Sequence, residues 1–145
     1  MKGAYVATAS VTTKAPAQAV YAALIDPAKI KQYLFGTEVS SDWKVGSRIT
    51  YRGEWQGKSY EDRGEILELI PNKRFSSTYW SSMGGRPDSP EYYNTVTYDI
   101  AASRGVTTLT VTQDNIESDE SASHSKSNWE MVLGALVKVA EAGLP

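Results

Sequence analysis

The sequence predicts a single α+β domain: a curved antiparallel sheet of six to seven strands wrapped round a long C-terminal helix, with two short helices after the first strand. Three observations lead to it. Residues 37–113 carry much of their apolar content with a period of two, which is typical of strands. Residues 119–141 carry it with the period of a helix. Two proline start signals, Pro16 and Asp26-Pro27, follow the first strand.

The N-terminal part is expected to form one strand and two helices. Residues 3–13 alternate weakly, with Tyr5 and Ala7 on the same face. Pro16 suits the first position of a helix, where a missing N–H group costs nothing. Asp26-Pro27 repeats the signal, with the aspartate as N-cap. Two short helices therefore follow the strand almost without a loop.

The middle of the chain is expected to form strands joined by turns. A short strand is expected at 37–41, and the next two strands pair around Gln56-Gly57, because glycine supplies the positive φ of a tight hairpin turn. Further strands are expected at 74–81, 92–100 and 106–113, with a long loop at 82–91 and a turn at 103–105. A broken alternation at 67–70 indicates a bulge. The residues expected to face the long helix from the central hairpin are Ile49, Tyr51, Gly53, Trp55, Tyr60, Asp62, Gly64 and Ile66.

The last helix has the clearest signals. Ser118 is expected to cap it, and the acidic residues 119 and 120 stand in its first turn, where the helix dipole favours negative charge. Gly143 is expected to end it. A helix over 119–141 would be roughly 34 Å long, enough to lie across a small sheet. Its apolar stripe consists of Trp129, Val132, Leu133, Leu136 and Ala140.

The composition excludes several classes of function. The 145 residues suit one domain, 1–145. With no Cys and one His, the chain has no disulfide, no thiolate nucleophile and no three-His zinc site, so we expect no metal and no cofactor. A net charge of -2 gives no basic footprint for nucleic acid. No apolar run is long enough for a membrane span and no signal peptide is recognisable, so a soluble, cytoplasmic protein is expected.

An ordered series of segments carries a resemblance over about residues 5–140. The segments are 16–27, Asp42-Trp43-Lys44-Val45-Gly46, Tyr51-Arg52-Gly53-Glu54-Trp55, 64–74, Val96-Thr97-Tyr98, 107–113 and Asn128-Trp129 with the closing helix. Together they resemble the activator of heat-shock-protein-90 ATPase-like family. The resemblance implies the helix-grip fold of the START-like (SRPBCC) superfamily, whose members enclose a hydrophobic cavity between sheet and helix. Because that superfamily also includes lipid carriers, polyketide cyclases and hormone receptors, the fold does not determine the function.

Two motifs suggest other chemistry but do not fit their surroundings. Gly53 with Gly57-Lys58-Ser59 is one residue short of the phosphate-loop spacing and lies in a hairpin instead of before a helix. The acidic stretch 114–120 has Ile116 where a calcium loop needs Asp or Asn, and it has no central glycine. Neither nucleotide nor calcium binding is expected.

Aromatic residues are the main candidates for a binding site. Thirteen of the fifteen aromatic residues are Trp or Tyr, whose polar tips suit the wall of a pocket as well as a core. Both interpretations stay open, as core filling and as a pocket lined with hydroxyl groups. The candidate ligand-binding residues, of which the first two are expected near an entrance, are Tyr33, Phe35, Tyr51, Trp55, Tyr60, Asp62, Tyr98, Trp129 and Leu133.

Asp62 and His124 are the candidates for polar chemistry. If Ile66 faces the helix, Asp62 does so too, and a carboxylate in an apolar cavity is a candidate acid, base or ligand anchor. The alternative, which we favour from the sequence, is a carboxylate that is solvated or paired with an arginine. His124, in the first turns of the long helix, is a candidate base or a half-exposed surface residue.

Three functions follow as hypotheses. The first is binding of a small hydrophobic or aromatic molecule (lipid, sterol or polyketide-like) between the C-terminal helix and the sheet. The second is a co-chaperone-like interaction with a chaperone, as the family name implies. The third is a metal-free cyclase, dehydratase or hydrolase that uses Asp62, His124 and a tyrosine as acid–base groups. No catalytic residue is assigned, and the oligomeric state stays open.

Overall fold

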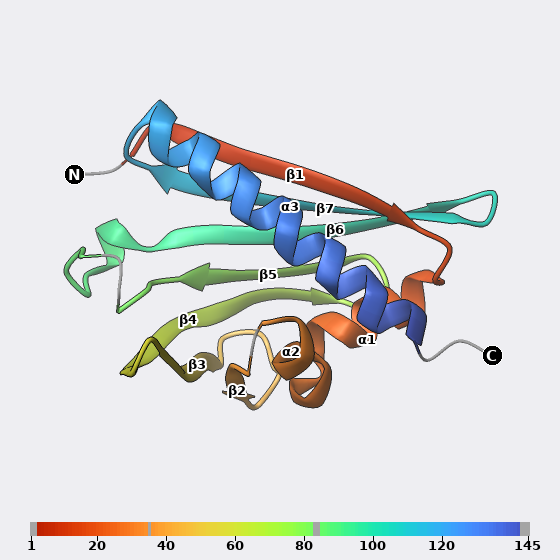
Figure 1. Ribbon diagram of the computed structural model, residues 1–145, viewed down its shortest axis with the longest axis horizontal. Helices are drawn as coiled ribbons and strands as arrows, with labels where there is room; N and C mark the ends of the chain where they lie inside the picture. The colour runs from red at the N-terminus through yellow and green to blue at the C-terminus, as the bar shows by residue number, and fades with distance from the viewer. Residues whose placement is uncertain (1–2, 35, 83–84, 143–145) are drawn as a thin grey trace.

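The computed structural model describes residues 3–34, 36–82 and 85–142. It contains three α-helices, α1 (Ala17–Ile25), α2 (Pro27–Tyr33) and α3 (Asp119–Ala142), and a short 3-10 turn, η1 (Pro90–Tyr92). The strands are β1 (Tyr5–Thr13), β2 (Glu38–Ser41), β3 (Arg48–Trp55), β4 (Lys58–Ile70), β5 (Arg74–Tyr79), β6 (Asn94–Ser103) and β7 (Val106–Ile116). They form one antiparallel sheet in the order β1-β7-β6-β5-β4-β3-β2, which confirms the predicted α+β architecture (Figure 1).

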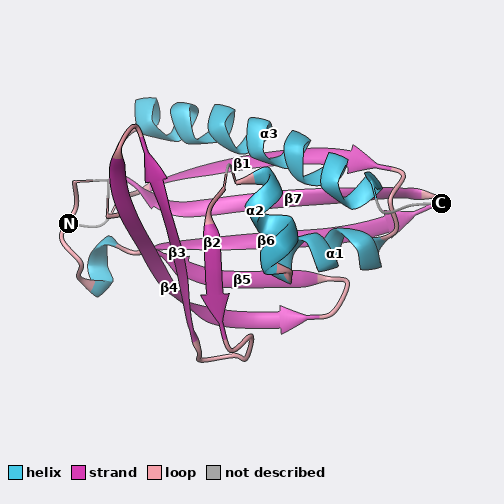
Figure 2. Ribbon diagram, turned by 60° about the horizontal axis from the view of Figure 1, so that its bottom comes forward, coloured by secondary structure: helices cyan, strands magenta, loops and turns pink. Residues whose placement is uncertain are grey.

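The helices share one side of the curved sheet. Figure 1 shows α3 running diagonally across the sheet, from the corner of β1 and β7 toward α1. It packs mainly against β1, α1 and α2, while α2 also packs against β2. Figure 2 shows β2 and β3 brought round toward the helices, so that the sheet holds α3 in a helix-grip arrangement. In this arrangement α3 lies over β1, and the inner faces of β3–β6 lie to one side of it.

The apolar core lies where the second half of α3 meets α1, α2 and the sheet. Its fully buried side chains come from α1, α3 and the sheet, and full burial of each stabilises the fold by about 1.5–3 kcal/mol. They are Val20, Leu24, Ile49, Ile66, Leu109, Val111, Leu133 and Leu136. The alternation in β3 and β4 thus turns Ile49 and Ile66 inward, as the sequence predicts.

The helix ends confirm most of the predicted signals. The Asp26 side chain accepts a hydrogen bond from the Ala28 N–H group at 3.0 Å, and Ser118 Oγ accepts one from the Ser121 N–H group at 3.1 Å. Pro16, expected at the first helical position of α1, is instead its N-cap residue, one place before Ala17, because its backbone is extended at φ -68 and ψ 158. Gly143, the predicted end of α3, lies outside the described residues.

The hairpins also follow the prediction, with local differences. Gln56 and Gly57 have φ of 50 and 80, as a tight turn requires, and the expected bulge lies between Ile66 and Glu68. The pairing of β1 with β7 has a further bulge between Tyr5 and Ala7, and Tyr5 is 44% exposed. β5 ends at Tyr79, two residues early, and β6 and β7 extend three residues further than expected at their distal ends. Residues 90–92 form η1, where the end of a loop and a strand from Tyr92 were expected.

Candidate functional site

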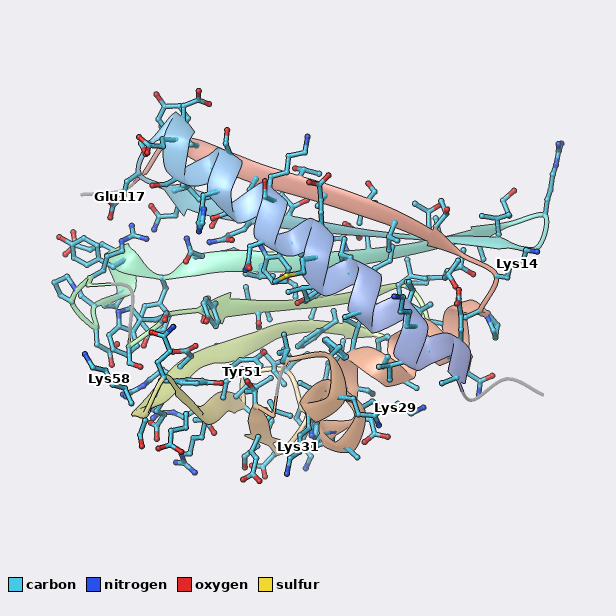
Figure 3. The ribbon with its side chains drawn as sticks, in the orientation of Figure 1. Lys14, Lys29, Lys31, Tyr51, Lys58 and Glu117 are labelled. Atoms are coloured by element: carbon cyan, nitrogen blue, oxygen red, sulfur yellow. The ribbon has the colours of Figure 1, made fainter. Side chains whose placement is uncertain are left out.

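Four partly buried aromatic rings gather beside one carboxylate on the helix side of the sheet. We call this group the aromatic face; its members are Tyr51, Asp62, Tyr79, Tyr98 and Trp129. The ring centroids of Tyr51 and Tyr79 are 5.9 Å apart, and those of Tyr98 and Trp129 are 5.8 Å apart, both edge to face. Tyr51 is labelled in Figure 3, within the fold and close to α2. Unlike the fully buried core residues, all four aromatic residues are only partly buried.

Strand register explains how these residues meet. Tyr51 in β3 stands opposite Asp62 in β4, and Tyr98 in β6 stands opposite Phe75 in β5 and stacks on it with centroids 5.8 Å apart. Tyr79 lies four residues after Phe75 in β5, so its side chain points to the same face of the sheet. On α3, Trp129 lies one turn before Leu133, on the helical stripe that faces the sheet.

Asp62 is held by donors from the neighbouring strand and the residues that follow it. Its Oδ2 accepts a hydrogen bond from the Tyr79 hydroxyl group at 2.6 Å, and its Oδ1 accepts one from the Ser82 backbone N–H group at 3.0 Å. The Ser82 hydroxyl group lies 3.4 Å from the same Oδ1. Asp62 is only 8% exposed. The interpretation favoured from the sequence, a solvated or arginine-paired carboxylate, is therefore wrong.

The nearby arginines point to the other side of the sheet. Arg63 pairs with Asp88 at 3.0 Å, and its guanidinium lies over the Trp80 ring at 5.2 Å. Arg52 pairs with Glu61 at 2.8 Å across the β3–β4 hairpin. In the described ranges no salt bridge includes Asp62, and Asp62 is the only buried residue with a charged side chain. Side chains alternate between the two faces along a strand, so Arg52 and Arg63 lie on the face of the sheet opposite to Asp62.

The tyrosine hydroxyl groups of the aromatic face stay protonated at neutral pH. Burial raises the pKa of Tyr51, and the nearby Asp62 carboxylate raises it further. Burial also raises the pKa of Tyr98 and, together with Asp62, raises that of Tyr79 well above its usual value. The Tyr79 proton is used in the bond to Asp62. Within the described part of the chain, the hydroxyl groups of Tyr51 and Tyr98 form no hydrogen bond.

Of the other candidate residues, three occupy structural positions. Tyr33 is 4% exposed and its hydroxyl group donates to the Ala23 carbonyl oxygen at 2.9 Å, so it lies in the core instead of at an entrance. Leu133 is fully buried in the same core. The Tyr60 ring lies across Gly53, and its hydroxyl group is 2.5 Å from Thr37 Oγ1. Phe35 and the side chain of Trp55 fall outside the description.

His124 is separated from this group. It is exposed on α3, and no hydrogen bond or salt bridge among the described residues involves it. Asp62 is buried. The acid–base set of Asp62, His124 and a tyrosine is therefore not assembled.

Sequence reasoning missed Tyr79 of the aromatic face and Gln113, which binds Trp129 beside it. Tyr79 follows Phe75 and Ser77 at a spacing of two, and this alternation could have placed it on the inner face. Gln113 continues the inward series of Leu109 and Val111, and its Oε1 accepts a hydrogen bond from Trp129 Nε1 at 2.8 Å. A polar residue at an inward strand position is the signal that identifies it.

Two clefts stand out, and neither includes a member of the aromatic face. One, of about 620 Å³, lies at the β4–β5 turn and is lined by residues that include Ile70, Arg74 and Ala101. The other, of about 210 Å³, lies beside the N-terminal segment and Tyr93. The cavity expected between helix and sheet is not among them. In the described ranges no cluster of three or more His, Asp or Glu residues could hold a metal ion.

The family model described as "Activator of Hsp90 ATPase homolog 1-like protein" matches residues 14–141. The chain belongs to this family, which confirms the resemblance. The family is associated with small-molecule binding and with chaperone binding. No protein with a curated description matches the chain. No helix among the described residues is long and apolar enough to cross a membrane.

Solved structures show the same fold. The solution structure of ChR145 from Cytophaga hutchinsonii is 39% identical, with a TM-score of 0.84 over 98% of this chain and 97% of that one. The Aha1 dimer from Colwellia psychrerythraea is 19% identical, with a TM-score of 0.74 over 97% of this chain and 99% of that one. DynU16, from the dynemicin biosynthetic locus, is 21% identical, with a TM-score of 0.77 over 95% of this chain and 48% of that one. The latter two likenesses concern the fold alone.

Proposed function

We propose that the protein binds a small, largely apolar molecule with an aromatic or polycyclic body at the aromatic face, between α3 and the sheet. One observation carries the proposal: the hydroxyl groups of Tyr51 and Tyr98 form no hydrogen bond in the described structure, and neither is among its fully buried polar atoms. A bound molecule can take the place of the water that such hydroxyl groups otherwise meet. The association of the family with small-molecule binding also supports this function.

The partial exposure of the four aromatic residues supports this function over simple core filling. Core packing favours residues that need no hydrogen-bond partner, and the buried positions of β3, β4 and α3 carry Ile49, Ile66 and Leu133. The aromatic face carries Tyr and Trp instead, with surface left over. Rings of this kind offer a large contact area at low cost in side-chain entropy.

The test is a titration of the full chain with a panel that contains a fatty acid, a sterol and a polycyclic aromatic ketone. Trp129→Phe identifies the part of the tryptophan fluorescence change that arises at the site. Tyr51→Phe and Tyr98→Phe should each weaken binding of a responding ligand roughly 2- to 10-fold, the usual worth of one neutral hydrogen bond. Tyr5→Phe, at an exposed position on β1, is the matched control. Failure of the panel to bind, or unchanged affinity in both tyrosine variants, would contradict the proposal.

The family assignment supports a second candidate, a co-chaperone-like interaction. Stimulation of a chaperone ATPase by the purified chain, lost on Trp129→Ala and kept in Tyr5→Phe, would favour it. No change in that ATPase at saturating protein would remove it. A ligand that competes with the chaperone would show that both use the aromatic face.

A further inference from the structure

The charges around the aromatic face restrict the molecule that it accepts. We infer that its ligand is uncharged and carries a hydrogen-bond acceptor, such as a ketone or quinone oxygen, and that carboxylate ligands such as fatty acids are rejected. The inference rests on the proposed function and adds the class of ligand. It follows from one charge and two hydroxyl groups.

The charge is that of Asp62. The carboxylate is buried and accepts hydrogen bonds from Tyr79 and Ser82, both of which are uncharged. These donors satisfy its oxygen atoms without neutralising its charge. An anionic group placed beside Tyr51 would stand next to this carboxylate. For two unit charges about 6 Å apart at an effective dielectric constant of about 20, the repulsion weakens binding on the order of a hundredfold.

The cations that could offset this repulsion face the other way. Arg52 and Arg63 lie on the outer side of the β3–β4 hairpin and are paired with Glu61 and Asp88. The lysines labelled in Figure 3 lie at the periphery, including Lys58 at the hairpin turn. Among the described residues no Lys or Arg is buried beside Asp62. A carboxylate ligand would therefore find no ion-pair partner there.

The hydroxyl groups of Tyr51 and Tyr98 determine the acceptor. Both carry their proton at neutral pH, so each can donate one hydrogen bond. Tyr79 cannot serve in this way, because its proton is already donated to Asp62. A pure hydrocarbon would bury both donors without a partner, which is unfavourable. A ketone oxygen can accept from one or both of them.

A positively charged ligand suits the Asp62 carboxylate but not the two tyrosine hydroxyl groups. An ammonium group would be attracted by Asp62, but it has no acceptor for the Tyr51 and Tyr98 protons. The faces of the rings are also partly used, since Tyr98 stacks on Phe75. The uncharged acceptor satisfies both hydroxyl groups and avoids the repulsion.

Four probes with one ring system test the inference on the full chain at pH 7: naphthalene, 2-acetylnaphthalene, 2-naphthoate and 2-naphthylmethylammonium. Binding is measured by equilibrium dialysis. The ketone should bind about tenfold more tightly than naphthalene and at least tenfold more tightly than the naphthoate. Tighter binding of the naphthoate or the ammonium probe than of the ketone would overturn the inference.

Variants assign each preference to its residue. Asp62→Asn should strengthen naphthoate binding about tenfold or more, whereas Glu61→Gln, which removes a carboxylate from the outer face of the same strand, should not. Tyr51→Phe with Tyr98→Phe should abolish the preference for the ketone over naphthalene. If Asp62→Asn does not fold, the ranking of the four probes on the unaltered protein still decides. Equal binding of all four overturns the inference but not the proposed function; binding of none overturns both.

Discussion

The Tyr79 hydroxyl group donates a 2.6 Å hydrogen bond to Oδ2 of Asp62, which joins β5 to β4 inside the fold. The two residues are 17 positions apart in the sequence. Just beyond Tyr79, Trp80 forms a single bridge to Arg63, where the regular pairing of β5 has ended. The bond therefore fixes the Asp62 carboxylate within the aromatic face, near the end of β5.

Loss of this bond should destabilise the protein. Tyr79→Phe leaves a buried carboxylate with one donor fewer, and hydrogen bonds to charged groups are worth about 1.5–3 kcal/mol. We expect the free energy of unfolding to fall by about that amount in urea denaturation. Tyr93→Phe is the matched control, because Tyr93 donates to the exposed Asp88. A similar loss in both variants would contradict the special role of Asp62.

Stability should fall at high pH because of Tyr33. Burial raises its pKa well above the ordinary 10.0, with smaller effects of Tyr98 and Tyr51. Below pH 10 both states are protonated and the contribution is fully present. Above pH 10 the unfolded state ionises first, so unfolding releases a proton and stability falls by about 1.4 kcal/mol per pH unit.

Urea unfolding between pH 9 and pH 12 measures this slope. In Tyr33→Phe the free energy of unfolding should fall less steeply, by about 1.4 kcal/mol per pH unit, because one proton fewer is released on unfolding. The other buried tyrosines still contribute to the slope. Tyr5→Phe, in which an exposed tyrosine is removed, should keep the slope of the unaltered protein. An unchanged slope in Tyr33→Phe would be inconsistent with its burial.

Two glycines should respond in opposite ways to the same substitution. A Cβ atom at Gly64 would lie 1.7 Å from the Thr78 carbonyl oxygen, so Gly64→Ala must displace backbone and should abolish or severely weaken folding. A Cβ atom at Gly134 in α3 meets nothing within 4 Å. Gly134→Ala should therefore raise the free energy of unfolding by about 0.5–1 kcal/mol. Thermal unfolding of both variants checks this pair, and a destabilised Gly134→Ala would contradict it.

Substitutions on the buried and the exposed face of α3 should have different effects on stability. Leu133 is fully buried, and Leu133→Ala should cost about 2–5 kcal/mol of unfolding free energy. Met131 is 54% exposed, and Met131→Ala should change stability by no more than about 0.5 kcal/mol. Urea denaturation of both variants measures the difference. Comparable costs would mean that α3 packs differently.

Much of the fold could be predicted because its signals are local. The Gln56-Gly57 turn, the Asp26 cap and the stripe on α3 each depend on residues within a few positions of one another. The bulge between β1 and β7 could not be predicted, because it depends on how Tyr5 pairs with Ile116 at the other end of the chain. The extra residues of β6 likewise arise from pairing with β7, and Ile116 at the end of β7 pairs with Tyr5 of β1.

The candidate site could likewise be predicted only in part. From the sequence, Tyr51, Asp62, Tyr98 and Trp129 could be assigned to the inner face, because strand and helix periods fix the direction of each side chain. Only the tertiary structure supplied Asp62 with Tyr79 and Ser82 as donors, 17 and 20 residues further along the chain. Periodicity determines which way a side chain points; strand register and the path of α3 decide what it meets there, and those depend on the packing of the whole sheet.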